Sequence, residues 1–344
     1  RATAPRDQRM SPTPRANTRP RLRAFAAAIT LCLTPILAAS GCRFNGHTAP
    51  PDNLGDPLPD YLDIAAVYNR RVHRLATLNT RGIIVFQYAD EEGDLTKDQG
   101  DLNLRIERPH RLALVIKKLG ETYIWLGADR DRYWLFNLLA DPSTLVLGRH
   151  ERINERKARA LTLPVPPREL LHLLALEPLP DPQTDAPDGT LPTISRDQRT
   201  GETVIRFRAT KTEHHRRTHH REHLDTWRIA LDPATNLPTR ITLLDHQGNP
   251  TLDADLQNPK SVRTTGPVNP DLGPDPITPA DITITRPDSD EYIRIIMEGL
   301  TDRPSNPTVF NLEERLETLR PERIIDIDQR SAPTPNPAQS GTNR

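Results

Sequence analysis

Cysteine is almost absent from this sequence, whose 344 residues include only Cys32 and Cys42. Cys32 lies inside an apolar run and Cys42 follows the end of that run, so the remainder of the chain has no thiol. A framework of disulfides, a Cys-ligated metal site and a thiol catalyst are therefore excluded from the region after residue 42.

An excess of charge of either sign is also missing, since 46 basic residues balance 46 acidic ones. Residues 1–41 hold seven of the basic residues and one of the acidic residues, which leaves 39 basic and 45 acidic residues in the rest of the chain. A net charge of −6 gives no basic surface large enough to favour nucleic acid as a partner.

The motifs of common enzymes do not occur: the chain has no GxSxG, HExxH, P-loop or dinucleotide-binding fingerprint. Paired carboxylates at Glu91 and Glu92 fall in a predicted loop. A second pair, Asp253 and Asp255, alternates with apolar residues and should face water, where general acid-base catalysis is not expected. The sequence therefore predicts neither an enzyme nor a bound cofactor.

The longest apolar run, residues 24–39, has 16 residues, which is short of the about 20 that a membrane-spanning helix needs. Three arginines precede the run, and small residues stand at its end and directly after it: Arg19, Arg21, Arg23, Ala38, Ala39, Ser40 and Gly41. These are the parts of a secretory signal. The segment resembles the lipoprotein class of signals, which implies cleavage between Gly41 and Cys42 and acylation of Cys42. A transmembrane helix with a basic cytoplasmic flank is the alternative.

This interpretation divides the chain into four parts. Residues 1–41 are expected to be the signal peptide, and Met10 would give it ordinary proportions as a start. Residues 42–59, rich in Pro, Gly, Asn and Asp, are expected to be a lipidated flexible tether. Residues 60–327 should form the folded domain, and 328–344, with little apolar content, a disordered tail.

The lipid anchor also predicts a location. The acylated chain would lie in the cell envelope, facing the periplasm, with the membrane as its first partner. In lipoproteins an aspartate after the acylated cysteine favours retention at the inner membrane. The corresponding residue here is Arg43, which favours the outer membrane.

The hydrophobic pattern of residues 60–327 changes from helical to alternating and back. Apolar residues at three- and four-residue steps predict a helix from Asp60 to Leu78. Short alternating runs with turn signals about every ten residues predict an antiparallel meander. The runs lie at 83–88, 102–106, 112–116, 123–126, 133–136, 144–147, 203–209, 226–231, 239–244, 252–256, 282–284, 293–295 and 324–327.

A helix at 166–176 is apolar on almost all sides and must be covered, and we expect the concave side of the sheet to cover it. A further short helix is predicted at 311–319. The predicted fold is mainly β: an antiparallel incomplete (open) β-barrel of about 11 strands, with two or three helices covering the concave face.

Two segments carry a resemblance to a known family. Residues 104–112, LRIERPHRL, are similar to a strand, an "RP" corner and the next strand of the LolA/LolB superfamily. Residues 128–136, ADRDRYWLF, look like its polar turn leading into an aromatic strand. The resemblance implies a periplasmic lipoprotein carrier or an outer-membrane lipoprotein receptor. The carrier's cavity arginine and the receptor's protruding hydrophobic loop have no counterpart that the sequence identifies.

Binding of acyl chains or lipoproteins is the favoured function. The expected lining of a lipid pocket comes from strands and from the apolar helix: Leu112, Leu114, Trp125, Trp134, Phe136, Leu170, Leu174 and Trp227. The same residues could pack as an ordinary core. The alternative function is that of a structural or sensory envelope lipoprotein that contacts other proteins, which a filled core and an exposed apolar patch would favour.

The most conspicuous polar cluster, residues 213–223, contains five histidines. His215 and His219 have the four-residue spacing that places two metal ligands on one face of a helix. Neighbouring arginines would repel a divalent ion, so no metal is predicted. A solvated loop that gains positive charge as pH falls, and then contacts anionic lipid headgroups, is the second interpretation.

Overall fold

The computed structural model describes residues 57–89, 93–153, 165–182, 191–208, 226–265 and 274–329. The predicted signal peptide with Gly41 and Cys42, nearly all of the tether, His215, His219 and residues 330–344 lie outside this part of the chain. The chain divides after residue 47, and every described residue belongs to the second unit, Thr48–Arg344.

A single sheet of fourteen strands forms the second unit, in the order β14-β6-β5-β4-β3-β2-β1-β13-β12-β11-β10-β9-β8-β7. The first seven strands along the chain are β1 Thr77–Ala89, β2 Leu95–Glu107, β3 Arg111–Lys118, β4 Glu121–Ala128, β5 Arg132–Asn137, β6 Thr144–Arg149 and β7 Thr193–Arg196. The others are β8 Thr203–Arg208, β9 Thr226–Leu231, β10 Pro238–Leu244, β11 Pro250–Ser261, β12 Ile277–Thr285, β13 Tyr292–Thr301 and β14 Arg323–Asp326.

Neighbouring strands are antiparallel, apart from β14, which runs parallel to β6. The prediction of an open, mainly antiparallel β fold is thus confirmed, since β14 and β7 end the sheet without pairing to each other. The predicted number of strands, about 11, was lower than the fourteen that the structure shows. One strand that the pattern missed is the edge strand β7, whose four residues are too few to show an alternation.

The described residues contain three α-helices and two short 3-10 helices. They are α1 Tyr61–Arg74, α3 Pro167–Leu173, α4 Leu312–Leu319, η2 His150–Arg152 and η5 Pro307–Phe310. The side chain of Asp60 caps α1 by accepting a hydrogen bond of 2.7 Å from the amide of Leu62. Among these helices, none has the length and apolar character needed to cross a bilayer.

The helix α1 ends at Arg74 instead of continuing to Leu78 as expected. Thr77 already begins β1, where residues 77–80 pair with β2. The β-branched threonines of this segment favour a strand, and pairing across the sheet overrides the helical spacing of the leucines.

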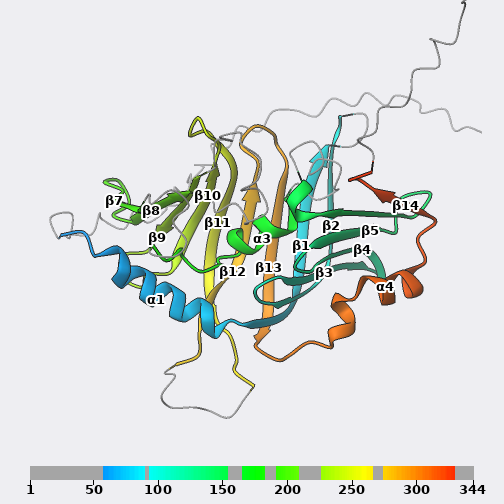
Figure 1. The fold of residues 1–344 in the computed structure, drawn as a ribbon, viewed down its shortest axis with the longest axis horizontal. Coiled ribbons are helices and arrows are strands. Elements are labelled where there is room, and N and C mark those ends of the chain that lie inside the picture. Colours follow the sequence, from blue (N-terminus) through cyan, green and yellow to red (C-terminus); the bar gives the residue numbers. More distant parts are fainter. Residues whose placement is uncertain are drawn as a thin grey trace, which may run out of the picture. The chain divides into compact units, whose positions relative to one another are not determined.

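Alternate residues of β3 show how the two faces of the sheet are used. Leu112, Leu114 and Ile116 join a large apolar cluster with α1 and α3, on what we name the inner face. Ala113 and Val115 point the other way and join a smaller cluster with η5 and α4, on the outer face. Two helices therefore cover the inner face (Figure 1), whereas the third expected helix, α4, covers part of the outer face.

The sheet curls around α3. This helix contacts both β4 and β10, which are seven places apart in the sheet. Seven strand spacings of about 4.8 Å would separate the two strands by about 34 Å in a flat sheet, whereas seven helical residues span only about 10 Å. The inner face must therefore be strongly concave, as the turning of strand direction across Figure 1 also shows.

Candidate functional site

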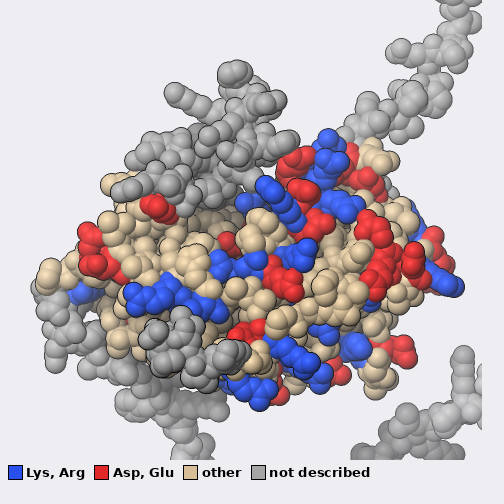
Figure 2. Space-filling model, turned by 60° about the horizontal axis from the view of Figure 1, so that its bottom comes forward, with Lys and Arg blue, Asp and Glu red and all other residues tan. Residues whose placement is uncertain are grey.

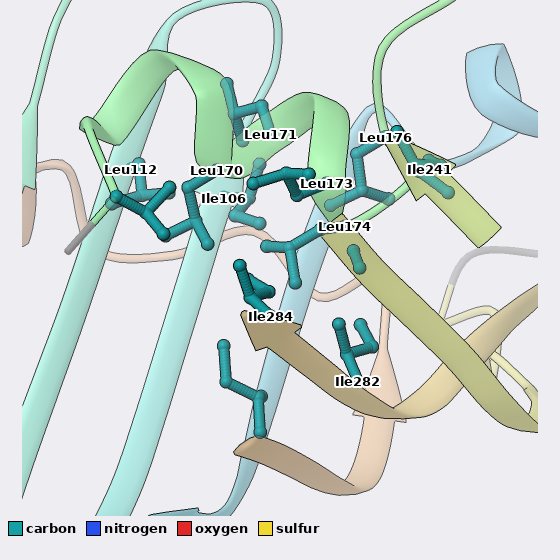
Figure 3. Close-up of a cluster of buried hydrophobic side chains, with 14 of the residues drawn as sticks. Ile106, Leu112, Leu170, Leu171, Leu173, Leu174, Leu176, Ile241, Ile282 and Ile284 are labelled. Carbon is teal, nitrogen blue, oxygen red and sulfur yellow. The ribbon is translucent and has the colours of Figure 1, made fainter. Parts of the chain in front are cut away.

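The centre of the inner face is occupied by the leucine-rich segment of α3. The helix begins after Pro166, whose carbonyl accepts a hydrogen bond of 3.1 Å from Leu170, and it carries Pro167 in its first turn. Its apolar side chains are all buried: Leu170, Leu171, Leu173, Leu174 and Leu176. Figure 3 shows them between Ile106 and Leu112 on one side and Ile241, Ile282 and Ile284 on the other.

Backbone hydrogen bonds close the C-terminal end of α3. Ala175 has a left-handed φ of 57°, which lets the amide of Leu176 reach the carbonyl of Leu171 at 3.0 Å. A left-handed alanine costs about 1 kcal/mol relative to glycine, so the end of this helix is held by its surroundings and not by local preference.

Side chains of α1 hold the segment that follows α3. Asn69 makes two hydrogen bonds with the backbone of Leu179, accepting at 2.7 Å from its amide and donating at 3.0 Å to its carbonyl. Arg71 donates to the carbonyl of Ala175 at 2.7 Å, and Tyr61 donates to that of Pro180 at 2.6 Å. We call these three side chains the α1 clamp, because their hydrogen bonds fix the backbone of the segment that follows α3.

Charged groups lie next to the clamp at the edge of the apolar core. The guanidinium group of Arg71 stands 4.6 Å from the centre of the Tyr68 ring. Burial raises the pKa of Tyr68 and lowers the pKa of Arg71. Arg108 donates to the carbonyl of Val72, and burial lowers its pKa too. Burial raises the pKa of Glu177, against the attraction of Arg108.

A histidine in α3 is held neutral by its position. The ring of His172 stacks on Trp227 of β9 with 4.6 Å between the ring centres. Burial, and next the positive charge of Arg168, lower the pKa of His172 to about 3. At neutral pH the His172 ring is therefore uncharged, and it packs on the indole of Trp227.

The eight predicted pocket residues do not come together. Five of them belong to the inner cluster, three from strands and two from α3 and its C-cap: Leu112, Leu114, Trp227, Leu170 and Leu174. The other three lie in the outer cluster beneath η5 and α4: Trp125, Trp134 and Phe136. Side chains in a strand alternate between faces, so Trp125 and Leu126, or Trp134 and Leu135, cannot line one cavity.

The outer aromatic cluster is tightly packed. The indole of Trp134 lies directly against Gly127 of β4, where a Cβ atom would overlap it. The Arg315 guanidinium of α4 stands 4.8 Å from the centre of the Trp125 ring. Val309, Phe310 and further apolar residues of η5 and α4 complete the cover. These contacts make the outer cluster a second core and give it no opening toward the inner face.

An exposed leucine marks the hairpin between β3 and β4. Leu119 is 97% exposed and has a left-handed φ of 53°, directly before Gly120 with a φ of 89°. Lys117 and Lys118 precede it. Sequence reasoning took this segment as a plain turn, although a leucine where Gly or Asn is favoured was a signal that could have been noticed. An apolar tip beside two cations is suited to contact with a membrane surface.

A crevice of about 280 Å³ lies between the β4–β5 turn and the start of α4, with Arg111, Asp129, Arg132 and Glu313 among its lining residues. Arg132 pairs with Glu313 at 3.4 Å and with Asp129 at 3.8 Å. These charges already neutralise one another, so the crevice is not suited to an acyl chain.

We next looked on the surface of the described residues for charged patches and for clusters of metal ligands. On the face in Figure 2, basic and acidic side chains are interspersed among other residues. The part of the chain that the structure describes has no group of three or more His, Cys, Asp or Glu residues placed to hold a metal ion. The inner face, with α3 and the α1 clamp, is therefore the candidate functional site.

Three solved structures are similar to this chain over most of its length. A LolA superfamily protein from Nitrosomonas europaea has 10% identity and a TM-score of 0.43, over 72% of this chain and 97% of that one. A DUF1329 family protein from Desulfovibrio piger has 9% identity and a TM-score of 0.43, over 73% and 98%. A domain from Vibrio parahaemolyticus assigned to outer membrane lipoprotein sorting has 10% identity and a TM-score of 0.43, over 74% and 97%.

Comparison at the level of sequence adds no relative. No family model matches the chain, and no curated protein matches it. The function proposed below therefore rests on the geometry of the inner face.

Proposed function

We propose that the chain is an envelope lipoprotein, anchored through acylated Cys42, whose curled sheet binds acyl chains or lipoproteins on its inner face at the outer membrane. The observation that carries this proposal is the construction of α3. A short helix and the turn after it carry five buried leucines that fill the centre of a concave sheet, and side chains of α1 hold the end of this segment through its backbone atoms.

The free energy lost when α3 leaves the inner face is similar to the free energy gained when a lipid chain is buried there. Five leucines moved out of the inner face lose about 2 kcal/mol each, about 10 kcal/mol together. An acyl chain with about fifteen methylenes gains about 12 kcal/mol when it is buried there, at about 0.8 kcal/mol for each methylene. A ligand of this length can thus replace the helix, while the clamp and the refilled core favour the closed form without it.

The hairpin tip supports a role at a membrane. Leu119 offers an apolar side chain that no described residue covers, and the nearby Lys117 would attract anionic headgroups, whereas Lys118 already pairs with Asp98 at 3.0 Å. A chain tethered to one leaflet by Cys42 could bring this tip to the bilayer surface and deliver or receive an acyl group there.

A protein-binding role is the second candidate. The observation in its favour is that α3 fills the inner face, with Leu173 and Leu176 at most 1% exposed. If this form never opens, the domain serves as a structural or sensory lipoprotein that meets its partners through its surface.

Native mass spectrometry of the acylated protein, purified from membranes, separates the two functions. A bound lipid or acylated peptide is expected under the first proposal, together with a mass increase at Cys42 that Cys42→Ser abolishes. If only bare protein is detected and fluorescent fatty acids do not bind, lipid handling is wrong and the protein-binding role remains. An unmodified Cys42 would refute the anchor independently of the result for the inner face.

A further inference from the structure

Three arginines lie close together on the outer face of the sheet, and two of them, Arg81 and Arg105, have no ion-pair partner among the described residues. Arg81 of β1 and Arg105 of β2 are diagonal neighbours, because Arg81 lies opposite Asn103 and Arg105 lies opposite Asn79. Odd-numbered residues of both strands point away from the inner cluster, so all four side chains share the outer face.

The third arginine comes from α4. Arg315 lies over Trp125, and Trp125 belongs to the same cross-strand row as Arg81 and Asn103, with Val115 between. Its Nε atom is buried and has no hydrogen-bond partner in the described part of the chain. A buried guanidinium nitrogen without a partner is costly, which suggests that a ligand supplies the missing acceptor.

The positive charges of the three arginines repel one another. Burial lowers the pKa of Arg105, and the positive charges of Arg81 and Arg315 lower it further. Within the described residues neither Arg81 nor Arg105 forms an ion pair or a hydrogen bond through its side chain. By contrast, Arg294 on the same face pairs with Asp281 at 2.7 Å.

Carboxylates also lie on this face, but none of them pairs with Arg81 or Arg105 among the described residues. Glu314 pairs with Arg315 at 3.2 Å and Glu107 pairs with Arg111 at 3.3 Å, whereas Glu298 lies opposite Arg81 and Asp101 lies diagonal to it without forming an ion pair. The guanidinium groups of Arg81 and Arg105 therefore keep donors for a ligand, and the amides of Asn79 and Asn103 add further hydrogen-bond donors. Like charges at diagonal positions of a sheet are destabilising unless something neutralises them.

We propose that Arg81, Arg105 and Arg315 bind a phosphate group on the outer face of the sheet. Planar guanidinium groups present paired N–H donors that match the oxygens of a phosphate, and several of them together bind it more strongly than one. The phosphate could belong to a lipid headgroup or to a small soluble molecule. The site is separate from the inner face, and it does not depend on the function proposed there.

Calorimetric titration tests the site, with the full chain reconstituted in phosphatidylcholine nanodiscs. Inorganic phosphate and dihexanoyl phosphatidic acid are titrated separately, and dihexanoyl phosphatidylcholine serves as the zwitterionic control. Saturable binding of both anionic probes indicates a site for any phosphate group. Binding of the phosphatidic acid alone indicates a lipid headgroup.

Matched variants show whether these arginines hold the phosphate. Arg81→Gln and Arg105→Gln should each weaken binding about tenfold, as the loss of a charge-assisted hydrogen bond predicts. Arg70→Gln removes the same charge from the exposed side of α1 and should leave binding unchanged. Thermal unfolding confirms that each variant is folded. The proposal is refuted if neither probe binds saturably, or if Arg70→Gln weakens binding as much as Arg81→Gln.

Discussion

The α1 clamp makes a quantitative prediction through Asn69. Replacing Asn69 by alanine removes two hydrogen bonds to the backbone of Leu179, at 2.7 Å and 3.0 Å. At about 1 kcal/mol for each bond, the closed form should lose about 2 kcal/mol. The population of molecules with α3 displaced should then rise about 30-fold, as long as the closed form remains dominant.

This increase has a direct consequence for ligand binding. If an acyl chain binds only after α3 leaves the inner face, the apparent affinity for a fluorescent fatty acid should rise in proportion to the open population, by about 30-fold. Equilibrium unfolding in urea measures the loss of stability, and fluorescence titration of the same protein, produced from residue 43, measures the affinity.

A destabilising change on the other face is the control. Leu312→Ala removes a buried side chain from the outer cluster and should cost about 2 kcal/mol. It leaves the clamp intact, so the fatty-acid affinity should stay at the wild-type value. If Asn69→Ala lowers stability but leaves the affinity unchanged, or if Leu312→Ala raises the affinity equally, the clamp does not control access to the inner face.

Three further predictions concern single residues. The pKa of His172 is about 3 in the folded protein and about 6.5 when unfolded, so stability is complete above pH 6.5 and is lost as pH falls toward 3. Between pH 7.5 and 5 this loss should be about 2 kcal/mol in urea unfolding, and it should be absent from His172→Phe. Gly127→Ala should destabilise the protein by about 1–3 kcal/mol and shift the tryptophan emission, because the new methyl group displaces Trp134; an unchanged spectrum and stability would contradict the packing. Leu119→Asn should keep or slightly raise stability, since asparagine tolerates a positive φ, but should weaken association of the non-acylated protein with anionic vesicles; equal flotation of both proteins would show that the tip does not touch the membrane.

Local patterns predicted the elements of the inner face well. The alternation of Leu112, Leu114 and Ile116 correctly indicated a strand with one buried side, because side-chain direction follows from the period of the strand alone. The leucines of α3 left no polar face for water, so their burial followed from the helix itself.

The composition of the pocket could not be predicted in the same way. Trp125, Trp134 and Phe136 lie in strands that are apolar on both sides, and the sequence of such a strand does not show which side packs against which helix. The packing of these three residues depends on α4, which begins 175 residues or more after them. The clamp was equally hidden, because Asn69 binds backbone atoms 110 residues away that any sequence would provide.

By itself the sequence determined the strand and helix types, the need to cover α3, and a signal-like segment ending at Cys42, since each depends on residues close together in the chain. The tertiary structure decided which aromatic side chains share a face, that α1 holds the segment after α3, and that Arg81, Arg105 and Arg315 lie near one another. These features arise from strand register, from the curling of the sheet and from contacts between distant segments, and a linear pattern of residue types carries none of that information.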